Sequence, residues 1–281
     1  LFSTMELVER YFHQEPRQME HRFNRILYTI IFLFLFSCQN TKKADRTAIK
    51  EVEKITFKKM LMIGNSFTFY WNLPQVLETM FDSSNINIKV DQKTIGGSKL
   101  KEHWEYNKDK SYNIKDYEFV VLNDHSTYPL NNVDTCSKYI NLFTNYINKY
   151  NGQTFVYGTW EYPYLKKISS LKPSNTMQIL DSLSKLNNAK YVPVGNAFEY
   201  VEKNHPHINL FMDDNKHPSP NATYLTACVF YSMISGKSPV GLPRRFQGKN
   251  IDGKKIYYII TEKNIYKTLQ EVAEIVTIDI R

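Results

Sequence analysis

A repeated alternation of short apolar runs with segments of helical periodicity is the feature that most constrains the fold of this chain. The apolar runs have the length of buried strands, and we expect strands at residues 59–63, 86–95, 119–122, 154–157 and 191–194. Apolar residues at helical spacing fall between them, at 74–81, 136–150 and 175–186. This alternation predicts a three-layer α/β/α sandwich with a mostly parallel five-stranded sheet.

The last core helix is marked at both of its ends. Ser219 is a good N-cap, Pro220 suits the first helical position, and Gly236 suits the end of the helix. The apolar side chains that would face the core follow at helical spacing: Ala222, Leu225, Val229 and Met233. Beyond this helix, residues 249–260 predict a hairpin or an edge strand, and residues 261–277 predict a surface helix.

A positively charged start followed by an apolar run is typical of a targeting segment. Arg22 and Arg25 precede residues 26–36, which are apolar except for one threonine, and the run ends just before Cys38. A transmembrane helix needs about 20 such residues, so the run favours a signal peptide. Residues 35–38 resemble the lipobox of bacterial lipoproteins, whose cysteine is acylated and becomes the new N-terminus. We therefore expect lipid attachment at Cys38; a plain secretory signal and a short membrane anchor are the alternatives.

Composition divides the chain into four parts. Residues 1–38 hold an upstream segment and the lipoprotein-type signal peptide, and the polar residues 39–56 are expected to form a tether. Residues 57–240 hold the expected strands and core helices, and residues 241–281 are expected to form a C-terminal extension packed on that domain. With this layout the protein would be an exported bacterial lipoprotein, anchored to a membrane and lying in the periplasm or at the cell surface.

Charge and cysteine content argue against several classes of protein. The net charge is +8, but Lys and Arg are spread along the chain without a nucleic-acid-binding signature, so we expect no nucleic-acid partner. His205 and His207 lack further ligands at suitable spacing, so we expect no metal site. Beyond Cys38 only Cys136 and Cys228 remain, too few for a disulfide scaffold, and Cys228 is expected to be a buried free thiol.

A small polar residue follows the first apolar run directly, in the sequence Gly64-Asn65-Ser66. Ligands bind beyond the carboxyl ends of strands in open α/β sheets, which is where Ser66 would lie. A nucleophilic serine needs a base, which is most often a histidine oriented by a carboxylate. Asp214 and His217, three residues apart in a loop before the last core helix, can supply both groups.

Donors for a developing oxyanion are also present after the expected strands. The backbone N–H of Ser66 is one, and the glycine pair Gly96-Gly97 offers another, because glycine lets a backbone N–H approach a substrate closely. Asn123, after the third strand, has a neutral side-chain amide. Sequence does not distinguish Gly96 from Gly97.

These segments, in this order, resemble those of the SGNH hydrolases, also called GDSL esterases and lipases. Gly64-Asn65-Ser66-Phe67 stands where the family often has Gly-Asp-Ser-Leu, Gly97 and Asn123 stand for its glycine and asparagine, and Asp214 and His217 match its late acid–base pair. The resemblance covers roughly residues 57–240, and segments such as "GGSKLKEHW" are similar to a bacterial branch of SGNH-like lipoproteins. Asn65 in place of aspartate, and Val121 in place of glycine, depart from the family pattern.

The resemblance implies a flavodoxin-like SGNH fold and a serine esterase that needs no cofactor. Ser66, His217 and Asp214 would form the catalytic triad, and the N–H groups of Ser66 and Gly97 with the Asn123 amide would form the oxyanion hole. The substrate would be a carboxylic ester, with O-acetyl groups on a carbohydrate as one candidate. The alternatives are an O-acyltransferase acting on a glycan and a non-catalytic surface protein that binds glycans.

Three further residues are candidates for substrate contact: Asn65, His125 and Trp160. His125 follows Asn123, and Trp160 follows the fourth expected strand at the same edge of the sheet. An aromatic ring there could stack on a sugar or hold an acyl chain. The alternative for Trp160 is packing within the domain. The alternative for His125 is a hydrogen-bonded position at the end of the strand.

Overall fold

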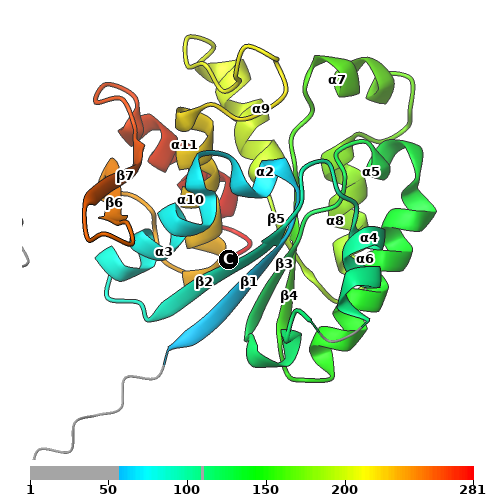
Figure 1. The fold of residues 1–281 in the computed structure, drawn as a ribbon. Coiled ribbons are helices and arrows are strands. Elements are labelled where there is room, and N and C mark those ends of the chain that lie inside the picture. The colour runs from blue at the N-terminus through cyan, green and yellow to red at the C-terminus, as the bar shows by residue number, and fades with distance from the viewer. Residues whose placement is uncertain (1–56, 109–110) are drawn as a thin grey trace, which may run out of the picture. The chain divides into compact units, whose positions relative to one another are not determined.

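A computed structural model describes residues 57–108 and 111–281, and its centre is a parallel sheet (Figure 1). The five strands run in the order β2-β1-β3-β4-β5, and every neighbouring pair is parallel. Their bounds are β1 Lys58–Gly64, β2 Ile88–Thr94, β3 Phe119–Leu122, β4 Gln153–Tyr157 and β5 Lys190–Val192. The predicted parallel sheet is therefore confirmed, and all the carboxyl ends of its strands meet at one edge.

Helices cover the two faces of this sheet as two separate layers (Figure 1). One layer holds α3 Leu73–Ser83, α9 Val194–Asn204, α10 Pro220–Ser235 and α11 Tyr266–Thr277. The other holds α4 Leu100–Asn107, α6 Val133–Asn148 and α8 Thr176–Leu186. Each layer buries an apolar core against its own side of the strands, which confirms the three-layer α/β/α sandwich.

Shorter elements complete the loops at the ends of the strands. They are α2 Ser66–Phe69, the 3₁₀ turns η2 Tyr70–Asn72 and η3 Ile114–Asp116, α5 Tyr128–Asn131 and α7 Pro163–Ser169. A two-stranded antiparallel sheet follows α10, formed by β6 Arg245–Lys249 and β7 Lys255–Ile260. Of the two structures predicted for residues 249–260, the hairpin is therefore correct, although it begins earlier than predicted.

The fifth strand is shorter than its apolar run suggested. It ends at Val192, and α9, which the sequence did not predict, begins at Val194. Pro193 separates them, because a proline cannot donate a hydrogen bond to the next position of a ladder. Gly195 in the first turn of α9 allows a close approach, since a Cβ there would lie 2.5 Å from the carbonyl oxygen of Thr159.

Helix α10 has the ends that its sequence predicted. The Ser219 hydroxyl accepts a hydrogen bond from the N–H of Ala222 at 3.2 Å, and Gly236 at the C-cap has a left-handed φ of 70°. Helix α11 packs against α10 and buries Leu269, Val272 and Ala273, so this predicted surface helix contributes one face to the core.

Residues Ile55–Arg281 form one compact unit. Cys136 and Cys228 are both buried free thiols, as expected for Cys228. Within the described residues, no helix is both long and apolar enough to cross a bilayer. The predicted signal peptide, the lipid attachment at Cys38 and the whole of the 39–56 tether lie outside the described residues.

Candidate active site

The candidate nucleophile lies at the carboxyl end of β1, where α2 begins (Figure 1). Asn65 caps α2, because its side-chain oxygen accepts a hydrogen bond from the N–H of Phe67 at 3.2 Å. Gly64 is required here, since a Cβ at this position would lie 2.4 Å from Thr68 Oγ1 and 2.8 Å from Asn123 Cβ. The strand thus ends in a tight turn that presents Ser66 at the first helical position.

The late loop brings the two predicted partners to Ser66. The hydroxyl of Ser66 lies 2.9 Å from Nε2 of His217, although 151 positions separate the two residues. Nδ1 of His217 lies 2.5 Å from Oδ2 of Asp214. A carboxylate only accepts hydrogen bonds, so Nδ1 carries the proton and Nε2 is free to accept from the Ser66 hydroxyl. The Ser-His-Asp arrangement expected from the sequence is present in this geometry.

The loop itself holds Asp214 in place. Oδ1 of Asp214 accepts hydrogen bonds from the backbone N–H groups of Lys216 and His217, at 3.0 and 2.9 Å. Partial burial raises the pKa of the Asp214 carboxyl, but the hydrogen bonds from His217 and Lys216 outweigh it and lower the pKa to about 2. Asp214 is therefore a carboxylate at neutral pH and can stabilise a protonated His217.

The glycine loop after β2 lies beside the end of β1. The N–H of Ile95 donates to the carbonyl of Gly64 at 3.1 Å, and Gly97 has a left-handed φ of 68°, whereas Gly96 does not. The backbone N–H groups of Ser66 and Gly97 donate to no acceptor among the described residues. Both groups are therefore available as donors to an oxyanion.

Asn123 lies on the other side of the β1 end, and its side chain is oriented by α2. Its Oδ1 accepts a hydrogen bond from Thr68 Oγ1 at 3.1 Å, and its Nδ2 donates to the carbonyl of Asp124 at 3.2 Å. This leaves one N–H of the amide as a donor. Thr68 thus fixes which end of the Asn123 amide is the donor end.

Asn65 connects the three loops of the candidate oxyanion hole. Its Nδ2 donates to the carbonyls of Ser98 and Asp124, at 3.2 and 3.1 Å. Its side chain is 4% exposed, and both of its polar atoms are used by the backbone. The structure therefore gives Asn65 a positioning role in place of the predicted substrate contact, and this explains how an amide can stand where the family often has aspartate.

His103, which the sequence analysis did not select, belongs to the same network. Its Nε2 lies 2.9 Å from the carbonyl of Gly64 and 2.8 Å from Ser98 Oγ, and its Nδ1 lies 2.8 Å from the Tyr112 hydroxyl. Burial lowers the pKa of His103 although the bond to Gly64 opposes it, so the ring is neutral at pH 7. Its place in α4, just after the glycine loop, is the only sequence signal that could have indicated this.

Asp124 and His125 continue the loop after Asn123. Oδ1 of Asp124 accepts hydrogen bonds from the N–H groups of Leu100 and His125, and burial raises the pKa of its carboxyl. His125 is half-buried and its Nδ1 lies 2.9 Å from Thr127 Oγ1. Burial lowers the pKa of His125, and the positive charges of Lys216 and Lys99 lower it further. His125 is thus a neutral, partly accessible side chain.

Trp160 packs in the core. Its ring stacks between Phe67, at 4.3 Å, and Phe198, at 4.2 Å, and its Nε1 donates to the carbonyl of Lys216 at 3.1 Å. Because Trp160 is only 1% exposed, the alternative of packing within the domain holds for this residue, and the predicted contact with substrate does not. Its neighbour along the chain, Tyr164, is exposed.

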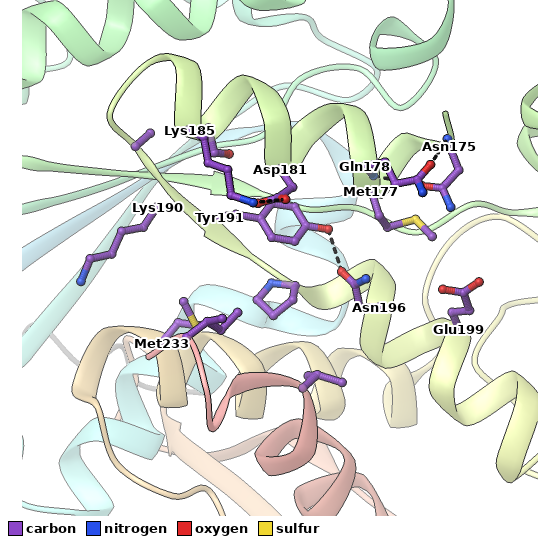
Figure 2. Close-up of a pocket in the computed structure, with 15 residues that line it drawn as sticks. Asn175, Met177, Gln178, Asp181, Lys185, Lys190, Tyr191, Asn196, Glu199 and Met233 are labelled. Carbon is purple, nitrogen blue, oxygen red and sulfur yellow. Dashed lines mark hydrogen bonds and ion pairs between the residues drawn. The ribbon is translucent and has the colours of Figure 1, made fainter. Parts of the chain in front are cut away.

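A hollow of about 790 Å³ lies away from the triad, at the β5 edge between α8 and α9 (Figure 2). Figure 2 shows Tyr191 and Asn196 side by side in its lining, with the tyrosine hydroxyl donating to Asn196 Oδ1 at 2.8 Å. Neither Ser66 nor His217 lines this hollow. Among the described residues, no three His, Cys, Asp or Glu side chains group as metal ligands.

The fold is that of the SGNH hydrolases, which confirms the resemblance at the level of fold. A DUF4886 family protein from Bacteroides uniformis is similar with a TM-score of 0.62 and 16% identity, over 80% of this chain and 96% of its own. A candidate SGNH hydrolase from Slackia heliotrinireducens has a TM-score of 0.53 and 21% identity, over 64% of this chain and 100% of its own.

An acetylxylan esterase from Geobacillus stearothermophilus is also similar, with a TM-score of 0.50 and 13% identity over 62% of this chain and 92% of its own. No family model matches the sequence, and no curated protein does.

Proposed function

We propose that this protein is a serine hydrolase that cleaves carboxylic esters through an acyl-enzyme. The observation that carries the proposal is the hydrogen-bonded line from Ser66 through His217 to Asp214, with contacts of 2.9 and 2.5 Å. Three side chains from the two ends of the domain meet in the order that a nucleophile, a general base and an orienting carboxylate require.

In the acylation step, Ser66 Oγ attacks the ester carbonyl while His217 Nε2 takes its proton. The carbonyl π electrons move to the oxygen, and the N–H groups of Ser66 and Gly97 with the Asn123 amide stabilise that charge. When the tetrahedral intermediate collapses, the bond to the leaving alkoxide breaks and His217 gives this oxygen its proton. Asp214 stabilises the imidazolium between the two transfers.

In the deacylation step, water takes the place of the alcohol. His217 accepts a proton from the water as its oxygen attacks the acyl carbon, and the same donors stabilise the second oxyanion. Collapse releases the carboxylic acid, and the proton returns to Ser66 Oγ. Loss of one oxyanion donor costs about 100- to 1000-fold in turnover in such sites.

For the substrate, we propose an O-acetyl group on a carbohydrate. Support comes from the similar fold of an acetylxylan esterase and from accessible side chains in the segments that follow β3 and β4, at the edge of the sheet where Ser66 lies. Tyr164 is exposed and its ring stacks on Tyr162, and His125 is partly accessible. An exposed tyrosine ring can pack on the apolar face of a sugar, and a histidine can hydrogen-bond to its hydroxyls.

The test compares wild type with Ser66→Ala on a short-chain aryl ester and on acetylated oligosaccharides, beside labelling by a fluorophosphonate. We expect the wild type to release acetate and to be labelled, and Ser66→Ala to lose both properties while remaining folded. Ser182→Ala, an exposed serine on α8, is the matched control and should behave as wild type. Wild-type hydrolysis by Ser66→Ala would exclude Ser66 as the nucleophile.

Product analysis with an acceptor sugar present separates hydrolysis from acyl transfer, because both share the acyl-enzyme. Release of free acetate at the same rate with and without the acceptor is the result that we expect. An acetylated acceptor in its place would identify an O-acyltransferase, and absence of labelling with retained glycan binding would identify a binding protein.

We also propose that the protein is exported and anchored through Cys38. The support is the sequence pattern of residues 22–38 alone. Metabolic labelling with a fatty acid should mark the wild type and not Cys38→Ser, and Cys136→Ser is the control.

A further inference from the structure

Tyr70 lies flat against the ring of the proposed general base. The ring centroids of Tyr70 and His217 are 4.3 Å apart, and their planes differ by 7°. Phe67 meets the same imidazole edge-on, at 5.7 Å and 89°. With Asp214 at Nδ1 and Ser66 at Nε2, the ring of His217 is contacted at both nitrogens and packed by two aromatic side chains.

The backbone after Tyr70 is in an unusual conformation. Trp71 has φ 50° and ψ 37°, and Asn72 has φ 55° and ψ 38°, so two successive residues other than glycine are left-handed. For a residue as bulky as tryptophan this region is rarely populated, and such strain persists only where the surroundings impose it. The turn joins α2 to α3 and leaves Tyr70 stacked on His217.

Two side-chain hydrogen bonds hold this turn. Trp71 Nε1 donates to the carbonyl of Pro218 at 2.9 Å, and Pro218 is the residue directly after His217. Asn72 Nδ2 donates to the carbonyl of Tyr258 at 3.3 Å, and Tyr258 belongs to β7 of the C-terminal hairpin. The turn is therefore hydrogen-bonded both to the loop that carries His217 and to the C-terminal hairpin.

We propose that Tyr70 is a positioning residue for His217, that the turn of residues 70–72 holds it there, and that the C-terminal hairpin supports the turn. This inference rests on the proposed function, because it assigns His217 the role of base. A stacked aromatic face restricts rotation of the imidazole, so Nε2 stays within reach of Ser66. The same face attracts the imidazolium that forms in the transition state.

The test separates this role from simple packing by comparing two substitutions at one position. Tyr70→Phe keeps the ring, and the Tyr70 hydroxyl makes no hydrogen bond within the described residues, so its kcat should stay within about twofold of wild type. Tyr70→Leu removes the ring and should lower kcat about tenfold, the order that loss of a cation–π contact implies, while KM is unchanged. A general loss of packing would not give this difference between kcat and KM.

Two further variants complete the design. Tyr150→Leu is the matched control, because Tyr150 is an exposed tyrosine just after α6 whose ring contacts that of Tyr146; it should keep wild-type kcat. Asn72→Gly keeps a left-handed backbone and removes the bond to the hairpin, so it should lower kcat about two- to fivefold at constant KM. If Tyr70→Leu does not fold, Asn72→Gly still tests the support of the turn.

An NMR measurement tests the contact independently of activity. A tyrosine face at 4.3 Å should shift the ring protons of His217 upfield in the wild type and in Tyr70→Phe, and this shift should vanish in Tyr70→Leu. Absence of the shift in the wild type, or wild-type kcat in Tyr70→Leu, would overturn the inference. Failure of the proposed function gives a different result, because the wild type itself would then show no hydrolysis that depends on Ser66.

Discussion

Asp213 and Asp214 are adjacent residues with the same side chain, and their surroundings separate them. Asp214 contacts His217, whereas Asp213 is exposed and makes no side-chain hydrogen bond or ion pair within the described part of the chain. We predict that Asp214→Asn lowers kcat by about a thousandfold or more, because the histidine loses its tautomer and its counter-charge. Asp213→Asn removes the same charge, and its kcat should stay within about twofold of wild type. Equal losses of kcat in the two variants would contradict the assignment of Asp214 as the partner of His217.

The depressed pKa of Asp214 also predicts a pH dependence of stability. The carboxyl has a pKa of about 2 in the folded chain and about 3.9 in an unfolded one, so its ionised form favours the folded state. This contribution is complete above about pH 5 and is lost as the pH falls toward 2. In urea titrations, the stability difference between wild type and Asp214→Asn should therefore be constant from pH 7 to about 5 and shrink from about 4 to 2. A difference that grows on acidification would contradict the prediction.

At the scale of single residues, the sequence singled out three side chains that the structure brings into hydrogen-bond contact, and it missed most of the residues that hold them in place. Ser66, Asp214 and His217 were found because catalysis restricts residue type and position after a strand. Asn65 and His103 make their contacts with loops 33 to 59 positions away, and nothing in their local patterns indicates those partners. Trp160 occupies the predicted edge of the sheet, but whether a ring there faces solvent or core depends on neighbours such as Phe198.

At the scale of elements, α10 shows that capping residues alone can define where a helix begins and ends. Its C-cap, Gly236, has φ 70° and open space around the position of a Cβ, so only the backbone conformation disfavours a side chain. We predict that Gly236→Ala lowers the free energy of unfolding by about 1 kcal/mol. The control is Gly96→Ala, where φ is not left-handed and space is also open, and stability should hold or rise slightly. Urea denaturation of both variants measures the difference, and equal effects would show that φ is not the cause.

The sequence analysis missed α9 and made β5 too long, and there is a physical reason for both errors. Helix α9 follows β5 after a single proline, so the apolar residues of the strand and of the first helical turn read as one run in the sequence. Apolar residues around such a junction suit either structure, and the packing of α9 against α10 decides between them.

At the scale of the molecule, the C-terminal residues are part of the core and not an optional addition. Leu269 on α11 is fully buried, and Gln270 beside it donates to the Tyr224 hydroxyl of α10 and to the carbonyl of Leu242. We predict that Leu269→Ala lowers the free energy of unfolding by about 2–5 kcal/mol, as loss of a buried leucine does.

The control for this prediction lies on the same helix. Ile275 is half exposed, so Ile275→Ala should cost about 1 kcal/mol or less. Both variants should unfold in one cooperative transition with the rest of the domain when urea denaturation is followed by circular dichroism. A separate early transition for the C-terminal residues would contradict their place in the core.

The sequence by itself determined the layer architecture, the boundaries of the best-capped helices and the choice of Ser66, Asp214 and His217 as candidates for a triad. Those features depend on periodic burial, on capping chemistry and on the few side chains that can perform acyl transfer. Each of these can be recognised within a short stretch of the sequence. Tertiary structure alone decided that Asn65 joins three loops, that Tyr70 stacks on His217 and that Asn72 donates a hydrogen bond to the C-terminal hairpin. Each of these contacts joins residues far apart along the chain, and their geometry exists only once the sheet and its two helical layers have packed.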